Sequence, residues 1–134
     1  MDQPSVVDTN VILRFLLGDH REHSEEARLF FDEVKGGERL AYIGEAIWAE
    51  CFFLMTKTYG IARSETLEKL EKLSSFRGMV GDHRSMLVRA FALTGKYNVS
   101  FVDALAFALA EERGWDLITF DKKLKRVFAA RSGN

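Results

Sequence analysis

The sequence predicts an α/β fold with a mostly parallel central sheet. Two observations predict it: stretches rich in β-branched residues lie near both ends of the chain, and apolar residues between them recur mostly at helical spacing. Asp8 follows the first of these stretches, and Asp121 comes just after the last. Because ligands bind at the carboxyl ends of parallel strands, such a sheet would place both Asp residues beside one crevice.

Length and composition predict one domain over residues 1–134, with a single sizeable core. Apolar residues make up 47% of the chain and charged residues 29%, which is ordinary for a globular protein. The net charge of -1 predicts no general affinity for nucleic acids, so any such binding would depend on a local basic patch. The N-terminus has no basic segment of a secretion signal, and no apolar run is long enough to span a membrane. With a lone cysteine, Cys51, the chain is expected to be cytoplasmic.

The first strand is expected to end at Asp8, and a helix with apolar positions between residues 11 and 16 follows. Asp8 therefore has a second interpretation, as an N-cap that accepts hydrogen bonds from free amides of that helix. A second helix is expected from Ser24 to residues 36–37, followed by a strand over residues 40–43.

The helix over residues 46–55 is apolar almost all round, which predicts either an interior helix or one that shares a face with another subunit. Trp48, Phe52 and Phe53 are the candidates for such a surface. Glu50 lies among these residues, and we expect it to be buried. Since an unpartnered buried carboxylate is unfavourable, Glu50 needs an arginine, a hydrogen-bond network or a metal ion.

The second half of the chain predicts further helices near residues 64–73, 84–95 and 100–113, with short strands near 79–80 and 116–119. Asp103 lies in the first turn of the nearly all-apolar helix that begins after Ser100. The two residues have the spacing of a capping box, which is a purely structural interpretation of Asp103. A short basic helix is expected after Asp121.

Four carboxylates thus occupy positions that can converge on one crevice: Asp8, Glu50, Asp103 and Asp121. Bare carboxylates at close range raise one another's pKa, and a hard divalent cation with oxygen ligands, Mg²⁺ or Mn²⁺, removes that penalty. A zinc site is not favoured, because His20 and His23 are the only close histidine pair and His83 is expected at the surface. Such an acidic Mg²⁺ site, without a visible nucleophile, suits phosphodiester hydrolysis.

The start of the last helix is strongly basic, with Lys122, Lys123, Lys125 and Arg126. These cations either hold a substrate backbone or complement the dipole of a solvated helix end.

At the four acids the chain resembles the PIN-domain family. The segments that carry the resemblance are VVDTNVILRFL with Asp8, IWAECFFL with Glu50, VSFVDALAFALAEERG with Asp103 and DLITFDKKLKR with Asp121. Their order and spacing, over essentially the whole chain, are most similar to the VapC-type toxins of bacterial and archaeal toxin–antitoxin pairs.

The resemblance implies a three-layer α/β/α sandwich and Mg²⁺- or Mn²⁺-dependent endoribonuclease activity, with the four acids as the catalytic and metal-binding residues. It also implies a homodimer and a cognate antitoxin that covers the site. Thr9 and Thr119 match positions that help shape the site. Many relatives carry a further acid two residues after the fourth, where this chain has Lys123, and this leaves one metal or two open.

Within this scheme Asp8 and Asp103 are expected to bind the first metal directly. Asp121 completes the shell or holds a second metal, and Glu50 orients or deprotonates the attacking water. Two other functions stay open: a catalytically silent PIN-like regulatory or RNA-binding module, and a receiver-type phosphotransfer protein that binds Mg²⁺. The latter needs a phosphoacceptor Asp and a lysine after a later strand, which Asp121 and Lys122 match only poorly.

Overall fold

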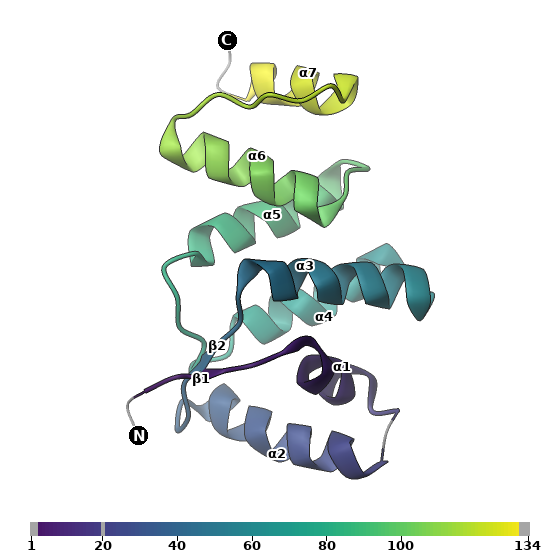
Figure 1. Cartoon of the computed structure of the whole chain (residues 1–134), viewed down its shortest axis with the longest axis vertical. Coiled ribbons are helices and arrows are strands. Elements are labelled where there is room, and N and C mark those ends of the chain that lie inside the picture. Colours follow the sequence, from purple (N-terminus) through teal and green to yellow (C-terminus); the bar gives the residue numbers. More distant parts are fainter. Residues whose placement is uncertain (1–2, 20, 132–134) are drawn as a thin grey trace. The chain divides into compact units, whose positions relative to one another are not determined.

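The computed structural model describes residues 3–19 and 21–131 of the chain, so His20, one member of the close histidine pair in the sequence, lies outside the described residues. The chain forms two compact units, Met1–Arg84 and Ser85–Asn134, called unit 1 and unit 2, and each is described by itself (Figure 1). Within the described ranges, no helix is both long and apolar enough to cross a membrane.

Unit 1 is built around a small parallel sheet. Strand β1 (Ser5–Val6) pairs with β2 (Ala41–Tyr42), and Ala41 also forms an isolated parallel bridge to Met79 (Figure 1). The three strands expected in this half of the chain are therefore neighbours, although each is shorter than predicted. The sheet is parallel because helices connect its strands.

The helices of unit 1 follow the predicted order. They are α1 (Thr9–Leu17), α2 (Arg21–Gly36), α3 (Glu45–Phe53), its π-helical continuation η1 (Leu54–Thr58), and α4 (Arg63–Ser74). Helix α3 packs against both α1 and α4, which covers it on two sides. Trp48 and Phe52 are consequently 2% and 6% exposed, and only Phe53, at 58%, reaches the surface. The interior interpretation of this helix is confirmed for Trp48 and Phe52, which offer no surface to another subunit.

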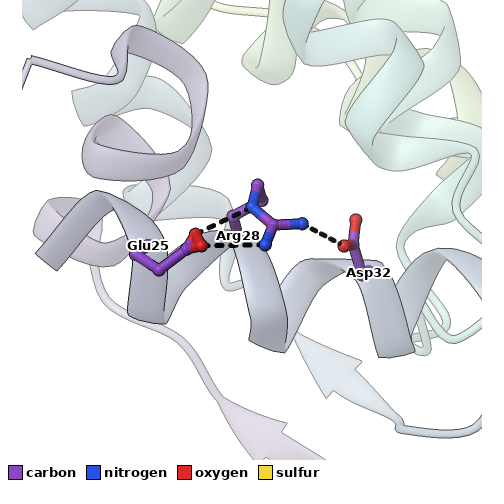
Figure 2. Close-up of polar contacts among 3 residues, drawn as sticks. All are labelled: Glu25, Arg28 and Asp32. Carbon is purple, nitrogen blue, oxygen red and sulfur yellow. Dashed lines mark hydrogen bonds and ion pairs between the residues drawn. The ribbon is translucent and has the colours of Figure 1, made fainter. Parts of the chain in front are cut away.

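The outer face of α2 carries a charged cluster in which Arg28 lies between Glu25 and Asp32 (Figure 2). Arg28 lies 2.9 Å from Glu25 and 2.8 Å from Asp32, one helical turn away on either side. The Arg28 guanidinium lowers the pKa of the Glu25 carboxyl, and Glu25 in turn raises the pKa of Arg28. All three side chains are at least half exposed, so this is a solvated face with little effect on stability.

Unit 2 contains helices α5 (Arg84–Lys96) from its second residue on, α6 (Phe101–Arg113) and α7 (Lys122–Ala130). Aromatic pairs join them: the ring centroids of Phe91 and Phe101 are 5.2 Å apart, and those of Phe107 and Phe128 are 4.9 Å apart. Helices α5 and α6 are also joined by an ion pair, in which Nε of Arg89 lies 2.7 Å from Glu111.

The strand predicted at residues 116–119 is not formed. Residues 115–119 adopt neither helix nor strand, and Ile118 and Phe120 are 85% and 98% exposed. The physical reason is that a strand needs a neighbour for its backbone, whereas Leu117 donates its amide to the Asp116 side chain at 2.9 Å. The structure thus gives helices with a small parallel sheet, consistent with an α/β fold, and the three-layer sandwich stays a prediction.

Candidate metal centre

Asp8 lies where β1 leads into α1. It is exposed and caps the helix, its Oδ1 accepting a hydrogen bond from the amide of Val11 at 3.4 Å. The capping interpretation is therefore confirmed, but this bond is long compared with the usual 2.9–3.0 Å. The carboxylate of Asp8 remains open to a stronger ligand such as a cation.

Glu50 lies on α3 and is joined to the start of α1 by the hydroxyl of Thr9, which donates to Glu50 Oε1. Thr9 is 8% exposed, so this hydroxyl is fixed inside unit 1. Glu50 itself is exposed, and the prediction of a buried Glu50 is wrong. The apolar neighbours of Glu50 in the sequence suggested burial, but its side chain turns toward the N-terminus of α1 instead of the core.

Asp103 is half-buried in the first turn of α6. Ser100 caps this helix by accepting the Asp103 amide at 3.0 Å, as the capping-box spacing predicted. Among the described residues, the carboxylate of Asp103 accepts no hydrogen bond from the Ser100 amide, so only one of the two hydrogen bonds of a capping box is present. That carboxylate is therefore not consumed by capping.

Asp121 caps α7, accepting the amide of Leu124 at 2.8 Å. Its own amide donates to Thr119 Oγ1 at 3.1 Å, which fixes the turn that presents the carboxylate. Thr119 thus holds the backbone at Asp121, whereas Thr9 bonds the side chain of Glu50. The sequence placed both threonines beside acids but did not reveal these different roles.

Each unit supplies two of the four acids, Asp8 and Glu50 in unit 1, Asp103 and Asp121 in unit 2. Over residues 3–19 and 21–131, none of the four carboxylates forms an ion pair with a lysine, arginine or histidine. Within the same ranges, no group of three or more His, Cys, Asp or Glu side chains is close enough to hold a metal ion. The side-chain oxygens of these four acids are all carboxylate oxygens, a ligand type that Mg²⁺ and Mn²⁺ prefer.

The basic residues after Asp121 lie at the beginning of α7 (Figure 1). Lys122, Lys125 and Arg126 are exposed and Lys123 is half-buried. The N-terminal end of a helix carries the positive end of its dipole, which disfavours cations. Lys122, Lys123 and Lys125 therefore do not complement the helix dipole, whereas the exposure of Lys122, Lys125 and Arg126 fits a solvated helix end, and substrate binding stays a prediction.

A groove of about 510 Å³ opens beside Asp8 in unit 1, and sequence reasoning missed it. Its lining includes the exposed residues His23, Glu26 and Arg39, and the Arg39 guanidinium lies 4.9 Å from the centre of the Phe30 ring. Nothing in the local pattern of the chain marks these residues, because they come from different elements that only the fold brings together.

His83 corrects another expectation, because it is buried at 9% exposure and not at the surface. Its Nε2 donates to the carbonyl of Ile43 at 2.8 Å, and its ring stacks on that of Tyr42 at 5.1 Å. His83 therefore fixes the end of β2, just before the helix that carries Glu50.

A model of the PIN domain matches residues 5–129, which is nearly the whole chain, and the protein therefore belongs to the PIN-domain family. The match covers residues of both units. A similar protein is the VapC ribonuclease of Aquifex aeolicus (strain VF5), 25% identical over 124 residues, which are 91% of this chain and 90% of that protein. No solved structure matches the chain.

Proposed function

We propose that this protein is a Mg²⁺- or Mn²⁺-dependent endoribonuclease and the toxin of a VapBC-type toxin–antitoxin pair. Membership of the PIN-domain family and the similarity to a VapC ribonuclease support this assignment. The structural observation that carries it is the bond from Thr9 to Glu50, which holds two sequence-distant acidic segments together at the start of α1. Neither Asp8 nor Glu50 is neutralised by a cation there, so their charge is available to a metal.

In this proposal Asp8, Glu50, Asp103 and Asp121 act together, and the chain is one PIN domain. A bound divalent cation supplies an activated water, a polarised phosphate and a stabilised leaving oxygen. Asp8 and Asp103 would hold this cation directly, and Asp121 would complete the set of ligands or hold a second ion. Glu50, held by the Thr9 hydroxyl, orients the attacking water or accepts its proton. In-line attack leaves a 5′-phosphate and a 3′-hydroxyl.

The substrate side of the proposal rests on the basic start of α7. The phosphates of an RNA strand are bound by four cations: Lys122, Lys123, Lys125 and Arg126. This electrostatic contribution to RNA affinity weakens as the salt concentration rises. We further propose a homodimer in the cytoplasm, silenced by a cognate antitoxin that covers the acids. The lone buried thiol of Cys51 fits a reducing compartment.

The test is cleavage of a labelled single-stranded RNA in the presence of Mg²⁺, Mn²⁺, Ca²⁺ or EDTA. We expect cleavage with Mg²⁺ or Mn²⁺ and none with EDTA. Asp8→Asn and Asp103→Asn should each abolish cleavage and weaken Mn²⁺ binding measured by electron paramagnetic resonance, with an unchanged circular dichroism spectrum. Asp82→Asn, an exposed acid in a loop, is the matched control and should cut like the unaltered protein.

Three results would contradict the proposal. An Asp8→Asn or Asp103→Asn variant with full activity removes those residues from the site. Binding of RNA without cleavage under any metal indicates the silent regulatory module. Labelling of an Asp by acetyl phosphate indicates the receiver-type protein.

A further inference from the structure

The ring of Phe120, in unit 2 directly before the candidate acid Asp121, is 98% exposed. An aromatic side chain normally buries much of its surface, and leaving it in water forgoes that stabilisation. Among the residues that the structure describes, Phe120 packs against no other ring and has no lysine or arginine over its face. Both faces of this ring are therefore open to a ligand.

Hydrogen bonds on either side of Phe120 fix its place in the chain. The amide of Asp121 donates to Thr119 Oγ1 at 3.1 Å, and the amide of Leu124 donates to Asp121 Oδ1 at 2.8 Å. Leu124 is 4% exposed, so the turn that carries Phe120 is tied to the interior of unit 2. A ring on a fixed turn loses less conformational entropy on binding than a ring on a free loop.

Cations follow Phe120 in the chain. Lys122, Lys125 and Arg126 are exposed, and none of them forms an ion pair within the described ranges. A ligand that offers a flat apolar face together with negative charge complements the open ring and these cations. A single nucleic-acid strand has both, in its bases and its phosphates.

Two other large apolar side chains of the same segment are exposed, and neither is an equally good platform for a base. Ile118, at 85%, is aliphatic and has no ring on which a base can stack. Trp115 is 56% exposed, but the Arg113 guanidinium already lies 5.3 Å from the centre of its ring. Phe120 combines an open ring with a place next to a candidate acid.

We infer that Phe120 stacks on an unpaired base of the RNA substrate and thereby selects which phosphate is presented to Asp121. RNA as the ligand is taken from the proposed function, on which this inference rests. Stacking needs a base that is free of its own helix, so the substrate is single-stranded at the cut. A protein partner is less favoured, because a lone protruding ring needs a matching pocket on the partner, whereas a base needs only the face of the ring.

The first test measures binding in EDTA, where no metal supports cleavage, to an RNA hairpin with a loop of about seven nucleotides. One loop base at a time is replaced by an abasic residue, and the stem fixes the register. For the unaltered protein, one abasic position should weaken binding about tenfold, as the loss of one base–aromatic stack does.

Phe120→Leu removes the ring but keeps apolar bulk. It should weaken binding of the complete hairpin about tenfold and show no further loss at that abasic position, whereas Phe120→Trp should restore both properties. Tyr59→Leu makes the same kind of change at an exposed aromatic side chain of unit 1, and it should bind like the unaltered protein. Because Phe120 is exposed, the circular dichroism spectrum should not change.

The second test maps the cuts in the same hairpin with Mg²⁺ or Mn²⁺. The unaltered protein should cut mainly at one position, and Phe120→Leu should spread the cuts over several positions. Unchanged cuts in Phe120→Leu, or an abasic loss that persists in this variant, would overturn the inference and leave the nuclease assignment standing. Binding without an abasic-sensitive position, or no binding at all, would also overturn it.

The opposite result separates the two proposals. An abasic loss that disappears in Phe120→Leu, without cleavage under any metal, would support the stack and contradict the nuclease assignment. Sedimentation tests the other class of partner. A Phe120→Leu chain that binds RNA normally but sediments as a smaller species than the unaltered chain would make Phe120 a contact between copies and refute the inference.

Discussion

Both units present an aspartate in the same local setting, and they differ in what comes before it. Asp8 and Asp121 each follow an extended segment and each cap a helix. The segment before Asp8 is a paired strand, in which Ser5 donates to the Leu40 carbonyl at 2.9 Å and Val7 to that of Tyr42 at 3.0 Å. The segment before Asp121 has no strand partner among the described residues.

This difference shows which structures form from neighbouring residues alone and which need a segment from elsewhere in the chain. A cap needs only the three residues that follow it, so the same chemistry forms in both units. A strand needs a second backbone from elsewhere in the chain, so an apolar, β-branched stretch does not create one by itself. Unit 1 supplies that backbone through β2, and its core can therefore depend on sheet and helices together. Unit 2 is held by contacts between helices.

The largest expected effect compares the two cores. Phe31 in unit 1 and Phe107 in unit 2 are 0% and 1% exposed, and each packs against other rings. Phe31→Ala and Phe107→Ala should each lower the free energy of unfolding by about 3–5 kcal/mol, because both leave cavities. Urea denaturation measures this loss in the free energy of unfolding. The fluorescence of Trp48 reports on unit 1, and that of Trp115 reports on unit 2.

If each unit is stabilised by its own core, each substitution moves chiefly the transition of its own tryptophan. Variants in which the other tryptophan is replaced by Phe serve as controls for the assignment of the signals. Equal shifts of both transitions by either substitution would show instead that the two units unfold as one, and would contradict separate stabilisation of the two cores.

The second prediction compares two glycines. A Cβ on Gly78 in unit 1 would lie 1.9 Å from the carbonyl oxygen of Arg39, a backbone atom, whereas nothing lies within 4 Å of one on Gly114 in unit 2. Gly78→Ala should cost about 3 kcal/mol or more through overpacking beside the sheet. Gly114→Ala should cost only about 1 kcal/mol, from its φ of +68° at the end of α6. Thermal unfolding of both variants checks the order, and a reversed order would contradict it.

These two regions also show what the sequence could predict. The helices were predictable because apolar spacing acts within a few positions, and Ser100 and Asp8 cap as expected. The cap at Asp121 was not predicted, and the helix expected from Ser24 begins at Arg21 instead. The parallel β1–β2 pairing was within reach, since helices connect the strands. The failures at residues 116–119, Glu50 and His83 share a cause. Each depends on what the fold brings from elsewhere, which periodicity cannot express.

The candidate site divides in the same way. The identity of the four acids and of Thr9 and Thr119 follows from the sequence, because it rests on residue type and order. The donation from Thr9 to Glu50 spans 41 positions and could not be derived from spacing. The groove beside Asp8 is likewise a product of packing, because residues of β1, α1 and α2 line it together, and no motif in the chain marks it.

The third prediction uses the two caps as a matched pair. The Asp121 cap bond is 2.8 Å long and that of Asp8 is 3.4 Å. Asp121→Ala should therefore cost about 1 kcal/mol of stability, and Asp8→Ala about 0.5 kcal/mol or less. Chemical denaturation of the two variants measures the difference. A larger loss for Asp8→Ala would mean that its carboxylate is committed to structure, which would weaken its candidacy as a metal ligand.

The smallest effect concerns a single thiol of unit 1. Cys51 is 0% exposed, and burial, with a smaller contribution from the charge of Glu50, raises its pKa from 9.0 to about 12. The thiol thus keeps its proton more tightly in the folded chain than in the unfolded one. Its contribution to stability is complete below pH 9.0 and is lost as the pH rises toward about 12.

Because the thiolate is the reactive form, iodoacetamide should barely modify native Cys51 between pH about 8 and about 10, but should modify it readily in urea. Val102→Cys places a thiol on α6 of unit 2 at a position that is 61% exposed, and is the matched control. In a Val102→Cys/Cys51→Ala chain the native rate should follow an ordinary thiol pKa. Native Cys51 that reacts as fast as this control would mean that α3 opens readily, and the core assigned to unit 1 would then not protect the helix that carries Glu50.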